Sequence, residues 1–163
     1  MKTLQETRIY ATNLHADHLD AIGRPYHTHL DRVLAHLDRL FPGAEESVRH
    51  GALLHSCVEE KRATLEELRA EGYPEETIQM VFWNTRPRDE GAPAYLDWIR
   101  NLAERAPVEA VMIKIADNED NNDPQRIARL PEDQRDVSAV YAQARMILED
   151  GLRRRVSPAQ AKR

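Results

Sequence analysis

Apolar residues recur at helical spacing along almost the whole chain, and this pattern restricts the possible fold more than any other feature. One stripe consists of Leu30, Val33, Leu34, Leu37 and Leu40, and residues three or four apart share one face of an α-helix. Alternating apolar runs and hairpin dipeptides, which are typical of strands, are scarce. The sequence therefore predicts an all-α helical bundle.

The predicted helices begin and end at capping and breaking residues. The helix that carries the first stripe ends at "FPG". Thr64 and Glu67 form a capping box ahead of a short helix, Gly72 ends that helix, and Pro74 fits the first turn of the next. The other helices are predicted over residues 4–18, 45–58, 94–105, 108–118 and 131–153, with a short turn at 124–130.

Length and composition favour one soluble helical domain. A chain of 163 residues can bury one substantial core, so we expect a single domain over residues 1–153 and a disordered tail over 154–163. Cys57 is the only cysteine, which fits a reducing compartment, and no apolar run could span a bilayer, so we expect a cytoplasmic protein. The net charge of -5 argues against non-specific binding to nucleic acid. The segment around Trp83 and Trp98 can pack internally or between subunits, which leaves a homo-oligomer open.

Three polar clusters interrupt the apolar pattern and are the candidates for chemistry. In the first, "RPYHTHLDRV", His29 precedes Val33 by four residues and shares the core-facing side of its helix. A hydrogen-bonded core histidine explains this position equally well. His29 alone therefore does not decide between a metal ligand and a core residue.

The second cluster, "ALLHSCVEE", places a histidine and two acids at the end of an apolar run. His55 follows Ala52 by three residues and so points into the bundle, and Glu59 lies one turn further along the same face. A buried neutral histidine is a good ligand for zinc, manganese or iron, and a nearby carboxylate can activate water. The alternative is that Glu59 and Glu60 belong to a solvated helix end.

The third cluster is "KIADNEDNNDP". Asp117 ends an apolar run, and Glu119, Asp120 and Asp123 follow near the expected helix C-terminus, where the helix dipole disfavours negative charge. Such an acid-rich end requires a compensating cation. An Asx-rich turn that ends the helix is the alternative, and both hold if Asp117 is a ligand while its neighbours form the turn.

Taken in order, the clusters resemble the HD-domain metal-dependent phosphohydrolases, and more closely small stand-alone proteins related to the hydrolase half of the RelA/SpoT alarmone enzymes. "DAIGRPYHTHLDRV" is similar to that group's "DKAGRPYLEHVERV", "GALLHSCVEE" to "AALLHDVVED", and "IKIADNEDNNDP" to "VKLADLEDNLDP". The loop "NTRPRDEGAPAYLDWI" likewise resembles "LTRRPGEPYLDYI". The resemblance covers about residues 14–148 and implies a single-domain helical bundle of the HD type.

The resemblance also implies roles for the matched residues. It implies that the metal ligands are His29, His55 and Asp117. Glu59 and Glu60 match the catalytic acid pair, and Asn121 matches a residue that contacts the substrate. We expect a divalent ion, manganese first, with zinc or iron as alternatives. Arg86, Arg88 and Lys114 are further candidates for contacts to a phosphate, although each can equally be an ordinary solvated charge.

The departures from the group's motifs concern the metal and the substrate. Ser56 stands where the group has the aspartate of its His-Asp doublet, so one charge and one metal ligand are lost and weaker metal binding is expected. Glu60 replaces an aspartate of the acid pair, and its longer arm is a candidate to lean toward the vacated position. Asp20 and Ala21 replace the arginine and lysine that precede the glycine of the first motif, which leaves guanine recognition without those two cations.

Two functions from different classes follow. The leading hypothesis is a metal-dependent phosphohydrolase that acts on a phosphorylated small molecule, a nucleotide or an alarmone-like (pyro)phosphate ester. The alternative is a catalytically impaired HD-type domain that binds a nucleotide or a protein partner without hydrolysis, and Ser56 is its evidence. A purely structural helical protein would leave three ordered clusters as coincidence.

Overall fold

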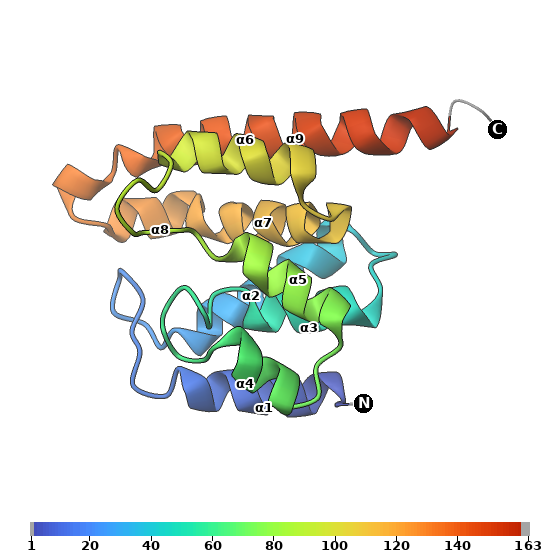
Figure 1. Cartoon of the computed structure of the whole chain (residues 1–163). Coiled ribbons are helices and arrows are strands. Elements are labelled where there is room, and N and C mark those ends of the chain that lie inside the picture. The colour runs from blue at the N-terminus through green and yellow to red at the C-terminus, as the bar shows by residue number, and fades with distance from the viewer. Residues whose placement is uncertain (1, 161–163) are drawn as a thin grey trace.

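The computed structural model describes residues 2–160 and is built from helices (Figure 1). Within these residues the strand-like contact is an isolated bridge between Leu19 and Pro25. The all-α prediction is confirmed. The elements are α1 (Leu4–Leu14), α2 (His27–Leu40), α3 (Glu46–Leu54), α4 (Leu65–Ala70), α5 (Glu75–Asn84), α6 (Tyr95–Arg105), α7 (Val108–Asn121), α8 (Pro124–Arg129), a 3-10 turn (Glu132–Gln134) and α9 (Val137–Gln160).

Helix α7 lies in the middle of the bundle (Figure 1). It packs against α2, α3 and α5 on one side and against α9 on the other, and α6 runs beside α9. Ile113 and Ala116 of α7 are fully buried, as are Val33 and Leu37 of the α2 stripe. The residues on either side of Asp117 are therefore held in the core of the protein.

Helix α3 approaches its neighbours closely because it carries a glycine. A Cβ atom on Gly51 would lie 2.8 Å from Cδ1 of Ile113 in α7 and 3.0 Å from Sδ of Met80 in α5. The missing side chain lets α3 lie against both helices. The C-terminal end of α3, where His55 follows, is thereby held near α7.

Some helix boundaries differ from the predicted ones. The predicted capping box is confirmed, since Thr64 Oγ1 accepts from the Glu67 N–H at 3.1 Å and the Glu67 carboxylate accepts from the Thr64 N–H at 2.8 Å. Helix α1, however, ends at Leu14 and α3 ends at Leu54, four residues before each predicted end. After α3 the chain forms successive turns up to Lys61, whose φ of 56° is incompatible with a continuing helix.

Helix α9 extends further than predicted. It continues to Gln160, so residues 154–160 are helical where a disordered tail was expected, and residues 161–163 lie outside the described part of the chain. The Arg155 side chain donates to the Ala103 carbonyl oxygen of α6 at 3.2 Å. This bond ties the extension to the bundle. Within residues 2–160, none of the helices combines the length and the apolar composition needed to cross a membrane.

Candidate metal centre and pocket

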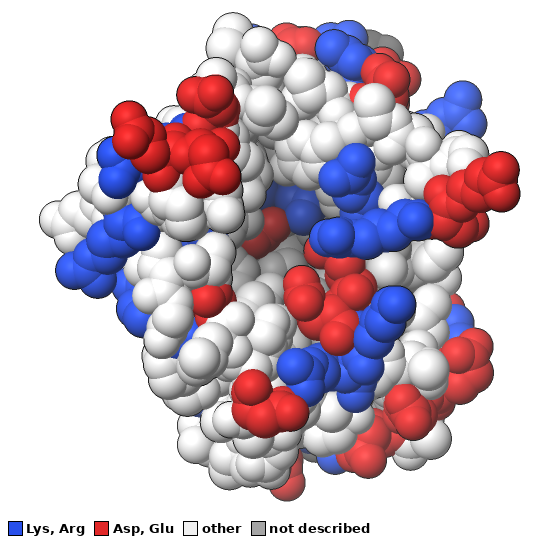
Figure 2. Space-filling view, turned by 90° about the vertical axis from the view of Figure 1, so that its left-hand side faces the viewer, with Lys and Arg blue, Asp and Glu red and all other residues white. Residues whose placement is uncertain are grey.

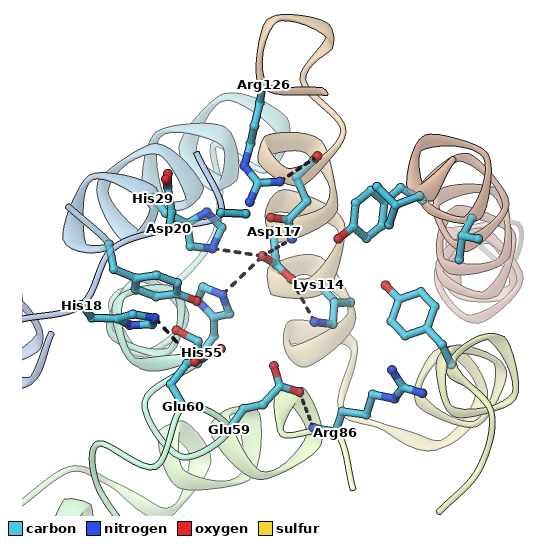
Figure 3. A pocket seen from close by; sticks show the side chains of 18 of the residues that line it. His18, Asp20, His29, His55, Glu59, Glu60, Arg86, Lys114, Asp117 and Arg126 are labelled. Atoms are coloured by element: carbon cyan, nitrogen blue, oxygen red, sulfur yellow. Dashed lines mark hydrogen bonds and ion pairs between the residues drawn. The ribbon is translucent and has the colours of Figure 1, made fainter. Parts of the chain in front are cut away.

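His29, His55 and Asp117 converge although they come from three different elements (Figure 3). His29 lies in α2, His55 directly follows α3, and Asp117 lies in α7. Nε2 of His29 lies 3.2 Å from Oδ1 of Asp117, and Nε2 of His55 lies 3.4 Å from the same oxygen. All three side chains are buried, and their ligand atoms lie within 4.8 Å of one another. We call these three residues the ligand cluster.

Hydrogen bonds on the far side of each imidazole orient the two histidines. Nδ1 of His55 donates to the Ala52 carbonyl oxygen at 2.7 Å, and Nδ1 of His29 donates to Oδ2 of Asp120 at 2.6 Å. Because the carbonyl and the ionised carboxylate only accept, Nδ1 carries the proton in both rings. The Nε2 atoms, which face Asp117, are therefore the atoms available to a metal ion.

Asp120 is itself held by an arginine. Nε and Nη2 of Arg32 donate to its two carboxylate oxygens at 2.7 and 3.1 Å. Burial raises the pKa of Asp120, but the hydrogen bonds from His29 and Arg32 outweigh burial and lower the pKa to about 2. The carboxylate is therefore ionised and forms a fixed acceptor for His29. Arg32 is also one of the cations that compensate the acid-rich end of α7.

Asp117 is ionised despite its burial. Nζ of Lys114 lies 2.9 Å from Oδ2, and Nδ2 of Asn121 donates to Oδ1 at 2.9 Å. Burial raises the pKa of Asp117, but the charge of Lys114 and the two cluster histidines hold it well below its usual value. The Lys114 ammonium lies 4.9 Å from the centre of the Trp98 ring. Lys114 thus occupies one carboxylate oxygen and leaves the other facing the histidines.

The pKa of His29 is raised in the protein without a metal ion. Burial lowers this pKa, but the hydrogen bonds to Asp117 and Asp120 outweigh burial. When Nε2 of His29 is protonated, it donates to Oδ1 of Asp117. A metal ion therefore competes with a proton for the same nitrogen.

The spacing of the ligand cluster fits a divalent metal ion. Bonds of about 2.0–2.1 Å in a tetrahedral centre place neighbouring ligand atoms roughly 3.3 Å apart. The separations from Asp117 Oδ1 are 3.2 and 3.4 Å, and all three ligand atoms lie within 4.8 Å of one another. Two imidazole nitrogens and one carboxylate oxygen are also ligands that such ions accept. These residues can hold a divalent metal ion without moving far.

Ser56 follows His55 and lies in the wall of the same pocket. Its side chain is buried, and its hydroxyl forms no hydrogen bond of ordinary geometry within the described residues. The Tyr26 hydroxyl is close enough to Ser56 to interact with it, since burial raises the pKa of Tyr26 and the Ser56 hydroxyl partly offsets this rise. The hydroxyl oxygen of Ser56 is shielded from solvent, so Ser56 places a neutral group, and no charge, beside His55.

Glu59 and Glu60 line the pocket but bind different partners. The backbone N–H of Arg86 donates to Oε1 of Glu59 at 2.9 Å, and Nη2 of Arg88 lies 3.8 Å from Oε2. Oε2 of Glu60 lies 3.6 Å from Nε2 of His18. Among the described residues, neither acid belongs to the ligand cluster. Glu60 pairs with His18, although its length made it a candidate for the position that the missing aspartate leaves vacant.

The pocket has a volume of about 510 Å³ and opens on one face of the molecule (Figure 2). Figure 2 shows a hollow with basic and acidic side chains around it. Its cations are Arg86, Arg88, Lys114 and Arg126, and its aromatic residues include Tyr26, Tyr95, Trp98 and Tyr141. The positive charge of these four cationic side chains favours an anionic occupant.

The structure gives roles to three residues for which the motifs implied none. Asp120 lies three residues after Asp117 on the same helix face, so its spacing carried the signal. His18 stacks on the Tyr26 ring with centroids 4.0 Å apart, and Arg126 reaches the pocket from α8 and donates to the Asn121 carbonyl oxygen at 3.2 Å. Nothing in the local pattern distinguished His18 or Arg126, because only the tertiary fold brings them to the pocket.

Asp20 has a structural role in the loop before α2. Its Oδ1 accepts from the backbone N–H groups of Ile22 and Arg24 at 3.0 and 2.9 Å. Burial raises the pKa of Asp20, but these bonds and Arg24 outweigh burial and lower it. The residue at this position therefore holds the turn in shape, while Ala21 contributes a short apolar side chain to the pocket wall.

Comparison with known proteins supports the fold. The sequence matches no protein-family model and no curated protein. Among solved structures, the chain is similar to a metazoan ortholog of SpoT that hydrolyses ppGpp, with a TM-score of 0.69 and 23% sequence identity over 94% of this chain and 95% of that one. The chain therefore has the all-helical fold of the HD-domain hydrolases, as its sequence motifs predicted.

Proposed function

We propose that the protein is a metal-dependent phosphohydrolase that acts on a phosphorylated small molecule, either a nucleotide or an alarmone-like (pyro)phosphate ester. One observation carries the proposal: the buried ligand cluster faces a pocket that also contains four cationic side chains. The SpoT ortholog with the same fold hydrolyses ppGpp, which supports this class of substrate.

His29, His55 and Asp117 would hold the metal ion through two Nε2 atoms and one carboxylate oxygen. The bound ion supplies the Lewis acidity that activates water and polarises a phosphoryl oxygen. Nδ1–H bonds to Ala52 and Asp120 keep both imidazoles in the orientation and tautomer that this role requires.

The remaining pocket residues divide into proton carriers and anion binders. Glu59 keeps Oε1 on the Arg86 N–H, so Oε2 is the oxygen available to take a proton from water. Glu60, which lies beside His18, would orient or deprotonate the same water. Phosphate oxygens would bind the side chains of Arg86, Lys114 and Arg126, and Asn121 would contact the substrate.

Ser56 supports a second candidate function, in which the domain binds a phosphorylated ligand or a protein partner without hydrolysis. The missing carboxylate removes a ligand from the metal centre. The pocket and its cations are nevertheless kept, so a ligand could still bind.

The two candidates are separated by metal content and phosphate release. We would purify the protein without chelators, measure bound metal, and assay release of phosphate and pyrophosphate from a panel of nucleotides that includes ppGpp. We expect metal-dependent release by the unmodified protein and its loss in Asp117→Asn, which removes the anionic ligand. Activity that appears only in Ser56→Asp would contradict the hydrolase and favour the binding domain.

Other expectations from the sequence stay predictions. The single cysteine favours a cytoplasmic location, and Trp83 leaves self-association open, since it is half-buried against the core.

A further inference from the structure

We propose that Ser56 turns the ligand cluster into a three-ligand, four-coordinate centre that selects zinc over manganese. This inference rests on the proposed metal site and specifies which ion that site holds. Ser56 would therefore both remove one metal ligand and determine which metal ion the site prefers.

The first step concerns Ser56 itself. It directly follows His55, its side chain is 3% exposed, and its hydroxyl has no partner of ordinary geometry among the described residues. A neutral hydroxyl binds a divalent ion poorly unless it is deprotonated. Ser56 therefore would not replace the missing carboxylate ligand, and that coordination position would be left to solvent.

The second step is that the neighbouring carboxylates are engaged elsewhere. Glu59 accepts from the Arg86 N–H, Glu60 faces His18, and Asp120 binds both His29 and Arg32. Within the described residues, none of these acids joins the ligand cluster. The charge lost at Ser56 is therefore not replaced by a second carboxylate.

The third step is that Asp117 offers a single oxygen. Its Oδ2 lies 2.9 Å from the Lys114 ammonium, which is itself buried. Moving Lys114 away would leave a buried cation without its partner. Asp117 therefore binds an ion through Oδ1 alone, and Lys114 offsets its negative charge.

The resulting donor set is two imidazole nitrogens and one carboxylate oxygen. Three protein ligands with a position left to solvent are typical of catalytic zinc sites. Manganese favours more oxygen ligands in an octahedral arrangement, and it also stands below zinc in the general order of affinities. A second carboxylate at residue 56 would favour manganese more than zinc, because it adds a hard anionic ligand and raises the coordination number.

The test measures metal binding in the absence of substrate. Zn²⁺ and Mn²⁺ would be titrated into the chelator-treated full chain, and the ratio of the two dissociation constants would be compared with that of Ser56→Asp. We expect the unmodified protein to bind Zn²⁺ much more tightly, and Ser56→Asp to narrow the ratio by on the order of tenfold or more.

Ser56→Asn is the matched control, since it has the shape of aspartate without its charge. It should leave the ratio close to that of the unmodified protein. Circular dichroism would check that each variant keeps its helical content. Co²⁺ absorption gives an independent readout of geometry, because four-coordinate cobalt absorbs far more strongly than six-coordinate cobalt. We expect a strong spectrum with Ser56 and a weaker one with Ser56→Asp.

Three outcomes would overturn the inference. If the protein binds metal but Ser56→Asp leaves the ratio of the Zn²⁺ and Mn²⁺ dissociation constants unchanged, the role of Ser56 is contradicted. The proposed hydrolase is not affected by that result. A weak, six-coordinate cobalt spectrum in the unmodified protein would contradict four-coordination. Absence of any metal binding would contradict the inference together with the proposed function.

Discussion

His29 shows how a single residue acquires its role from its surroundings. The sequence alone did not decide whether His29 is a metal ligand or a hydrogen-bonded core residue. The Asp120 carboxylate, 2.6 Å from Nδ1, fixes which nitrogen carries the proton, and Arg32 fixes Asp120 in turn. This chain of partners is typical of metal-binding histidines.

Replacing Asp120 with asparagine should therefore weaken metal binding without removing a ligand. In Asp120→Asn the acceptor for His29 loses its charge, and we expect affinity for Zn²⁺ to fall by roughly 10- to 100-fold. Competition against a chelating dye measures this change. Glu119→Gln is the control, because it removes the neighbouring charge, which pairs with Arg39, away from the cluster. Equal affinities in the two variants would contradict the role of Asp120.

Small residues decide how closely the helices approach one another. Gly51 lets α3 lie against α5 and α7, and Gly151 plays the same part between α9 and α6. A Cβ atom on Gly151 would lie 2.9 Å from Cβ of Ala103 and 3.0 Å from its carbonyl oxygen. Because one of these atoms belongs to the backbone, the contact can be relieved only by moving the helices apart.

Gly151→Ala should destabilise the protein although alanine is the better helix former. Alanine gains about 1 kcal/mol in helix propensity over glycine, whereas overpacking costs about 1–3 kcal/mol. We expect a net loss in the free energy of unfolding, measured by urea denaturation. Gly43→Ala is the control, since a Cβ atom there meets nothing within 4 Å. Equal or greater stability of Gly151→Ala would show that α6 and α9 separate easily.

At the scale of the whole molecule, the ligand cluster joins α2, the end of α3 and α7. An ion bound there links segments that are far apart in the sequence, and it stabilises the folded state because the unfolded chain does not present the site. Without the ion, Asp117 is balanced by the Lys114 ammonium and by the proton on His29.

The protonation of these residues predicts how the stability of the metal-free protein, and its gain in stability from a metal ion, change with pH. The lowered pKa values of Asp117 and Asp120 stabilise the metal-free fold above about pH 4, and this contribution is lost as pH falls further. The raised pKa of His29 stabilises it fully below its ordinary value of 6.5, and this contribution is lost as pH rises through the raised pKa. These three groups together contribute most to metal-free stability between about pH 4 and 6.5, whereas burial of His15, which lowers its pKa to about 3, opposes them as pH falls below 6.5.

Added Zn²⁺ should raise the Tm more at pH 8 than at pH 5.5, because the ion must displace the proton on His29 Nε2. Thermal melts with EDTA and with excess Zn²⁺ at both pH values measure this difference. His29→Asn should reduce both the loss of metal-free stability above pH 6.5 and the difference in the Zn²⁺-dependent gain in Tm between the two pH values. A gain in Tm that is the same at both pH values would contradict the competition between ion and proton.

Local patterns were sufficient for the helical class and for the motif residues. Helical spacing predicted the all-α fold, and the capping box at Thr64 predicted the start of α4. The predicted ends of α1 and α3 were wrong, because the chain enters turns after Leu14 and Leu54 that the apolar spacing does not reveal.

The sequence by itself determined which residue types interrupt the apolar stripes, and thereby named His29, His55 and Asp117 as candidates. Only the tertiary structure decided that their ligand atoms meet, which tautomer each imidazole adopts, and that Lys114 occupies one oxygen of Asp117. The physical reason is that helical periodicity is a property of neighbouring residues, whereas a metal site depends on the packing of helices that lie far apart along the chain.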